Sequence, residues 1–76
     1  MVPMTLPDLG TDNARLSGWL VEVGEAVQAG ERVCEVRIPG ATIGVLAPVD
    51  GRLHSRNASV NQQLQAGQTL GDIQPE

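Results

Sequence analysis

The stretch ARLSGWLVEVGEAVQAGERVCEV, residues 14–36, recurs in the same chain as GRLHSRNASVNQQLQAGQTLGDI, residues 51–73. The two copies align without a gap at a constant offset of 37 residues. Identical or conservative pairs run along the alignment: Arg15-Leu16 with Arg52-Leu53, Val27 with Leu64, Gln28-Ala29-Gly30 with Gln65-Ala66-Gly67, Val33 with Leu70, and Val36 with Ile73. A match of this length predicts two similar halves related by a pseudo-two-fold axis.

Turn-forming residues divide both copies into short apolar runs. Gly and Pro punctuate the chain at Pro7-Asp8-Leu9-Gly10, Pro39-Gly40, Pro48–Gly51 and Ala66-Gly67, among other places. The runs between them are three to eight residues long and rich in Val, Leu and Ile, and none keeps a helical period. Closely spaced short strands of this kind predict an all-β sandwich or barrel.

The core should be aliphatic, because Trp19 is the only aromatic residue. The alternation of apolar residues is ambiguous between Trp19 and Val23. The expected core residues are Leu16, Leu20, Val21, Val23, Val27, Val33, Val36, Ile43, Val45, Leu53, Val60, Leu64, Leu70 and Ile73.

A hairpin is expected between the two halves, in the stretch EVRIPGATIGV, residues 35–45. Pro39 presets φ for the second position of a type I or II turn, and Gly40 permits the positive φ that type II requires next. Because two-residue hairpins prefer the primed turn types, we expect splayed arms or a bulge near Ala41. Its place between the halves puts this hairpin at one end of the fold, with both chain termini at the other.

Size and charge limit the function. The 76 residues predict one domain over 1–76, with residues 74–76 a candidate start of a linker. The net charge of −4 argues against nucleic acid as a partner. No apolar run is long enough to cross a membrane, and no signal sequence is recognised, so we expect a cytoplasmic, monomeric domain without a membrane partner.

The reactive side chains are few. All five basic residues are arginines, so the chain has no lysine to carry an amide-linked prosthetic group. Cys34 stands alone and is expected in the core. His54 has no second ligand at metal spacing, and Asp50, His54 and Ser55 form no catalytic set that spacing supports. We therefore expect neither catalytic residues nor a metal site.

The order of these motifs resembles the lipoyl domain of 2-oxoacid dehydrogenase acyltransferases. The residues that carry the resemblance are Trp19-Leu20-Val21, Gly24-Glu25, Val27, Gly30, Val33-Cys34-Glu35-Val36, Ala41-Thr42-Ile43-Gly44, Ala47-Pro48 and Gly51. It implies a flattened eight-stranded barrel of two four-stranded antiparallel sheets with pseudo-two-fold symmetry, a fold shared with biotinyl domains. It covers nearly the whole chain. It also implies that Trp19 is packed and partly covered, because Trp19 matches a family position on a sheet surface.

The sequence departs from the resembled family at the hairpin tip. There the family has Asp-Lys, whose lysine carries lipoate, and this chain has Pro39 and Gly40. Arg37 and Ile38 also stand where the family often has Glu and Thr. The tip is thus a degenerate attachment hairpin with Gly40 at the lysine position, and no cofactor is expected.

Two functions remain open. The first is a non-lipoylated, non-catalytic module that binds a protein partner in or with a multienzyme complex. Its contact residues would be Arg37, Ile38, Pro39, Gly40 and Ala41. The alternative is a lipoyl carrier domain of a dihydrolipoamide acyltransferase that has lost its lysine by mutation or drift.

Overall fold

The chain folds entirely into strands and turns. The structure is a computed structural model that describes all 76 residues. It contains eight strands: β1 Val2–Thr5, β2 Ala14–Trp19, β3 Ala26–Val27, β4 Arg32–Ile38, β5 Ala41–Leu46, β6 Gly51–Arg56, β7 Gln63–Leu64 and β8 Thr69–Pro75. The predicted all-β class is confirmed, and no segment is helical.

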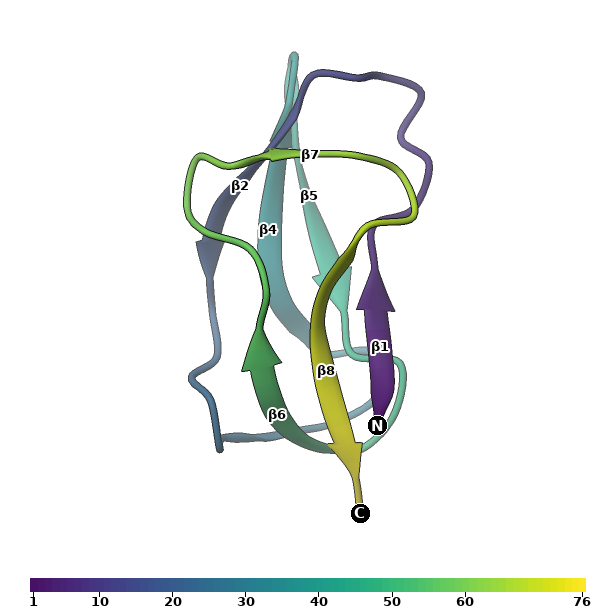
Figure 1. The fold of residues 1–76 in the computed structure, drawn as a ribbon, viewed down its shortest axis with the longest axis vertical. Coiled ribbons are helices and arrows are strands. Elements are labelled where there is room, and N and C mark those ends of the chain that lie inside the picture. The colour runs from purple at the N-terminus through teal and green to yellow at the C-terminus, as the bar shows by residue number, and fades with distance from the viewer.

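Two four-stranded antiparallel sheets face each other (Figure 1). Their strand orders are β1-β8-β6-β3 and β5-β4-β2-β7. The β4–β5 hairpin projects at one end, and both termini lie at the opposite end, as the position of the hairpin predicted. Antiparallel pairing of β1 with β8 brings the termini together by setting Val2 opposite Ile73. The predicted flattened barrel of two sheets is thereby confirmed.

The internal repeat is visible in the backbone hydrogen bonds. The amide of Gly24 donates to the carbonyl of Leu53, and the amide of Asn61 donates to the carbonyl of Leu16. The two bonds are equivalent in the repeat: donor Asn61 lies 37 residues after donor Gly24, and acceptor Leu16 lies 37 residues before acceptor Leu53. A register shift also interrupts β2 between Leu16 and Gly18 and β6 between Leu53 and Ser55. The predicted pseudo-two-fold relation therefore holds for β2 to β4 and β6 to β8.

The first and fifth strands complete the symmetry, although the sequence repeat does not include them. The Leu6 amide donates to Gln68 and the Leu6 carbonyl accepts from Gly67. Ala47 makes the same pair of bonds with Glu31 and Gly30. Leu6 and Ala47 are 41 residues apart, because the loop after β1 is longer than the loop after β5.

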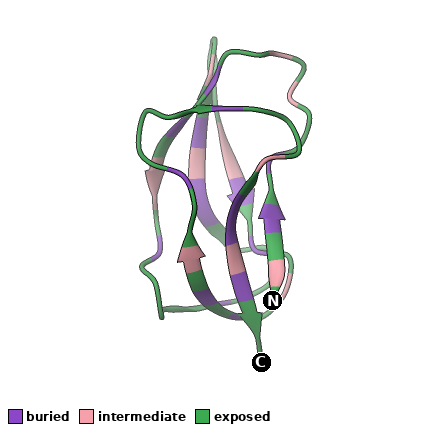
Figure 2. Cartoon of the chain, in the orientation of Figure 1, coloured by how far each residue is buried: buried purple, intermediate pink, exposed green.

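Buried residues recur along the strands of both sheets (Figure 2). They form two clusters, one around Leu16, Val36 and Leu70 and one around Val33, Leu53 and Ile73. Ten of the expected core residues are confirmed as buried: Leu16, Val21, Val27, Val33, Val36, Val45, Leu53, Leu64, Leu70 and Ile73. The expectation for Trp19 is also confirmed, since its ring is half-buried and packs against both clusters.

Four expected core residues lie elsewhere. Leu20, Val23 and Val60 are 51%, 56% and 55% exposed. The chain has left the strands at these positions and runs through turns, so the in-out alternation of a strand no longer applies. Ile43 is only half-buried, because β5 is an edge strand that pairs with β4 alone.

The C-terminal residues continue the sheet that contains β1, β8, β6 and β3. Gln74 and Pro75 belong to β8 and pair with Arg52 and Gly51 of β6. The amide of Glu76 donates to the carbonyl of Asp50 at 3.3 Å. A linker beginning at residue 74 stays a prediction.

Candidate interaction site at the β4–β5 hairpin

The hairpin tip is a two-residue turn. Ile38 of β4 is paired with Ala41 of β5, and Gly40 has φ 81°. Proline followed by a residue with positive φ is the combination of a type II turn, as the sequence predicted. The expected bulge near Ala41 is wrong, since the register shift of this pair of strands lies between Arg32 and Cys34. Splaying of the arms stays a prediction. Because β4 is also hydrogen-bonded to β2, the sheet supports this arm of the hairpin up to the Ile38–Ala41 pair.

The five residues predicted for partner contact differ in exposure. Arg37, Pro39, Gly40 and Ala41 are exposed. Ile38 is half-buried and packs against the first core cluster, because it follows Arg37 in the strand and points to the opposite face. Only part of the Ile38 side chain is available to a partner, and the contact role of all five residues stays a prediction.

The tip does not supply a cofactor attachment group. A Cβ atom placed on Gly40 would meet no atom within 4 Å, so space is open there. Gly40 has no side chain to acylate, and the chain has no lysine elsewhere. The residues present therefore do not fit an amide-linked lipoyl or biotinyl group.

An open depression lies beside the tip, and two arginines line it. Its lining residues are Asn13, Arg15, Arg37, Ile38, Pro39 and Gly40. Arg15 of β2 and Arg37 of β4 are cross-strand partners, although 22 residues separate them in the sequence. Sequence reasoning missed Arg15 and Asn13, because the pairing register of β2 on β4 cannot be read from the strand pattern.

Cys34 is a core residue, as expected. Its side chain is fully buried in β4 between the sheets. Burial, and secondarily the negative charge of Glu35, raise the pKa of the Cys34 thiol from 9.0 to about 11. The thiol is thus protonated and inaccessible at neutral pH, which is the opposite of a reactive cysteine.

The residues near His54 do not form a catalytic set. The Ser55 hydroxyl donates to Asp72 Oδ2 at 3.1 Å, and Asp50 Oδ1 accepts from the Ala29 amide at 2.7 Å. His54 is exposed on β6, at the register shift between Leu53 and Ser55, where it has no cross-strand partner on β8. The structure also holds no group of three His, Cys, Asp or Glu residues that could bind a metal, and no helix long and apolar enough to span a membrane.

The fold and the tip together define a class of protein. Two four-stranded sheets related by a pseudo-two-fold axis, with an exposed hairpin at the end away from the termini, are the architecture of a biotinyl or lipoyl carrier domain. The family model described as "Biotin-requiring enzyme" matches residues 2–73. The chain belongs to this biotin/lipoyl family.

A solved structure agrees with this assignment. The lipoyl domain of the 2-oxoglutarate dehydrogenase complex from Azotobacter vinelandii superimposes with a TM-score of 0.77. The alignment covers 97% of this chain and 96% of that domain at 20% sequence identity. A search among curated proteins returned no match. The predicted resemblance to lipoyl domains is confirmed at the level of family and fold.

Proposed function

We propose that this domain is a non-lipoylated relative of the lipoyl domain that acts by binding a protein partner in or with a multienzyme complex. The observation that carries the proposal is the tip itself. The hairpin is regular up to the Ile38–Ala41 pair, yet Gly40 stands at its apex in a chain without lysine. Such a domain keeps the fold of a carrier without the residue that would hold the carried group.

The family supports the general setting of this proposal. Its members normally carry lipoate or biotin on a lysine, and lipoyl domains work as non-catalytic parts of multienzyme complexes. A cytoplasmic location, a monomeric state, and a parent chain that includes a dihydrolipoamide acyltransferase belong to the proposal. So does the assignment of the contact to Arg37–Ala41.

The alternative is a carrier domain that has lost its lysine and has gained no new role. The intact scaffold favours this alternative as well, because both sheets and the core are complete although Gly40 stands at the lysine position. The two functions differ in one measurable respect, since only the first requires that the hairpin end still bind a partner.

The test has two parts. The domain is expressed with a lipoyl ligase and with a biotin ligase, and its intact mass is measured beside the Azotobacter vinelandii lipoyl domain as a positive control. We expect the sequence mass, with or without the initiating Met1. An added lipoyl or biotinyl mass would overturn the proposal.

The second part measures binding. The unmodified domain is titrated into purified 2-oxoacid dehydrogenase complex of the same organism, and association is followed by calorimetry. We expect saturable binding. The Azotobacter vinelandii lipoyl domain without its lipoyl group is the control here, and we expect it not to bind at the same concentration. Failure to bind any component of the complex would favour the alternative.

A further inference from the structure

Four exposed polar side chains form a row across the sheet next to the hairpin. Arg15 is paired with Gln63 on one side and with Arg37 on the other, and Arg37 is paired with Thr42. Directly paired residues project from the same face of a sheet, so the row Gln63–Arg15–Arg37–Thr42 spans all four strands. All four residues are exposed.

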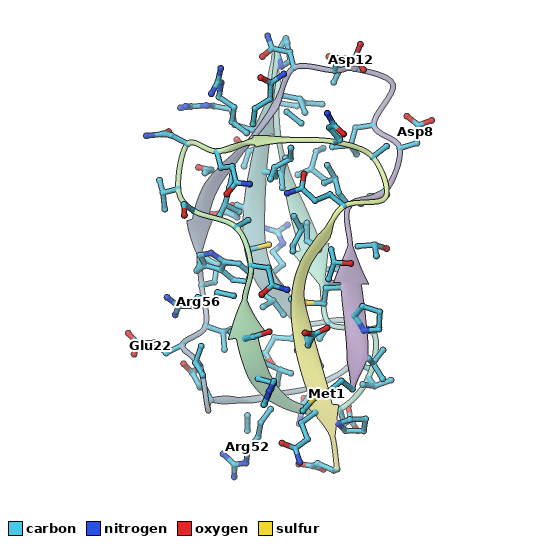
Figure 3. All side chains as sticks on the ribbon, in the orientation of Figure 1. Met1, Asp8, Asp12, Glu22, Arg52 and Arg56 are labelled. Atoms are coloured by element: carbon cyan, nitrogen blue, oxygen red, sulfur yellow. The ribbon has the colours of Figure 1, made fainter.

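The two central residues of this row carry unpaired positive charge. Arg15 Nη1 donates to the carbonyl of Asn61 at 2.9 Å, which fixes one edge of its guanidinium and leaves its other donors free. The carboxylates of the neighbouring loop do not bond to either arginine. Asp8 Oδ1 accepts from the Gly10 amide, and Asp12, labelled at the hairpin end in Figure 3, contributes its backbone carbonyl to Gln63. Like charges directly opposite each other on a sheet are unfavourable.

The other half of the molecule provides an internal comparison. Arg52, the repeat equivalent of Arg15, donates from Nη1 to the carbonyl of Gly24 at 2.9 Å, as Arg15 does to Asn61. Arg52 lies at the end that holds the termini (Figure 3), and its cross-strand partners are Ala26 and Gln74. Gln74 is the repeat equivalent of Arg37. Arg15 thus has an equivalent arginine in the other half of the molecule, whereas Arg37 does not. A pair of neighbouring arginines therefore occurs at the hairpin end and not at the equivalent place in the other half.

We propose that Arg15 and Arg37 form a docking site for an acidic segment of a partner protein. Two guanidinium groups side by side can each take a carboxylate with a pair of hydrogen bonds. Pro39 and the exposed part of Ile38 supply an apolar wall to the same depression, which fits an aliphatic side chain between two acidic ones. This inference rests on the proposed function, because it names the surface and the partner chemistry of that same hairpin end.

The observations favour a protein segment over other anions. A nucleic acid would meet a chain with a net charge of −4 and only two clustered arginines, which is too little positive charge for backbone binding. A free phosphate would need an enclosed site with convergent donors, whereas this depression is open and lies along the sheet face.

The probe is a fluorescein-labelled peptide, Gly-Glu-Glu-Leu-Glu-Gly, with its Gln-for-Glu version as the uncharged control. Binding to the whole domain is measured by fluorescence anisotropy at 50 mM and 200 mM NaCl, and the site is mapped by amide shift perturbation. We expect perturbed amides at residues 13–16 and 36–42, at least tenfold loss of affinity in Arg37→Glu, and a similar loss in Arg15→Gln. Arg52→Gln is the matched control and should change the affinity less than twofold.

Each other outcome overturns the docking site. Equal losses in Arg52→Gln and Arg15→Gln would show a general charge effect. Equal binding of the uncharged peptide would exclude carboxylate recognition. Displacement of the peptide by 10 mM inorganic phosphate at constant ionic strength would indicate a small-anion site. Failure of this inference is distinguishable from failure of the proposed function. A domain that binds the complex equally well with Arg37→Glu loses only the inference, and a domain that binds the peptide but no complex component loses only the proposed function.

Discussion

Trp19 and Arg56 occupy equivalent positions of the repeat, and each donates a hydrogen bond to the chain segment that follows the other. Trp19 Nε1 donates to the carbonyl of Ala58 at 3.0 Å, and Arg56 Nη2 donates to the carbonyl of Val21 at 2.7 Å. The acceptors Val21 and Ala58 are themselves equivalent and buried. Arg56 Cζ lies 5.6 Å from the centroid of the Trp19 ring, within the range of a cation–π contact. One pair of residues therefore ties the two halves together at the middle of the barrel.

Replacing Trp19 by Phe should destabilise the fold through the lost donor. The carbonyl of Ala58 would be left without a partner, which costs about 1–3 kcal/mol of unfolding free energy. The measurement is urea denaturation followed by far-UV circular dichroism, since the variant has no fluorescent side chain. Arg56→Met is the companion variant and should cost less, because Arg56 is exposed and, unlike Trp19, packs against neither core cluster. Equal stability of Trp19→Phe and the parent would contradict the structural role of this bond.

Truncation of paired core leucines should be costly in both halves. Leu16 and Leu53 are equivalent in the repeat and 0% and 1% exposed, so Leu16→Ala and Leu53→Ala should each cost about 2–5 kcal/mol. Val23→Ala and Val60→Ala are the controls and should lie within about 0.5 kcal/mol of the parent, because both valines are in exposed turns. Ile43→Ala should fall between these groups. A large loss in either valine variant, measured by the same denaturation, would place that turn in an interface.

Cys34 should make stability fall in the alkaline range. Burial raises the pKa of its thiol from 9.0 to about 11, so between these values the unfolded chain releases a proton that the folded chain keeps. The stabilising contribution is complete below pH 9 and is lost as the pH rises through about 11. The chain has no lysine and no tyrosine, so no other side chain ordinarily titrates in this window. Thermal unfolding between pH 7 and 11 should show the decline, and Cys34→Ala should remove most of it.

Sequence reasoning predicted the fold well because the repeat is carried by the buried strand residues. Val33 and Leu70, or Leu16 and Leu53, are restricted in both copies by the same space between the sheets. The same repeat also misled, since Val23 and Val60 correspond to each other and are both exposed in turns. An apolar residue in a turn cannot be told from a strand residue by its spacing alone.

The residues that were missed have weak local signals. Met4 lies in a short edge strand next to Pro3. Ala58 lies outside the strands and accepts a hydrogen bond from Trp19, 39 residues away. Leu6, Ala14 and Ala47 complete the missed core residues. At the candidate site, the tip residues were predicted from turn chemistry, but Arg15 joins Arg37 only through the register of β2 on β4. Contacts that are set by the pairing register of two strands cannot be predicted from the apolar pattern of either strand.

A lysine placed at the hairpin tip separates the two functions. Gly40→Lys alone would force an L side chain to adopt φ 81°, which costs roughly 1–2 kcal/mol while Pro39 holds the turn. Pro39→Asp with Gly40→Lys removes the proline constraint, and the open space at Gly40 leaves the new amine exposed. We expect this double variant to fold and still to resist lipoylation, because Arg37 places a positive charge beside the tip and Ile38 replaces a polar arm residue.

The decisive comparison adds Arg37→Glu to the double variant. If the arms of the hairpin have been remodelled for a partner, the triple variant should gain a lipoyl mass on co-expression with the ligase while the double variant stays at its sequence mass. Circular dichroism and the urea midpoint must match between the two variants, so that the difference is one of recognition and not of folding. Complete modification of the double variant would mean that only the lysine was lost, because the remaining surface would then still be that of a carrier. In that case the positive charge at Arg37 has no part in excluding the ligase, and the domain is a carrier without its attachment residue.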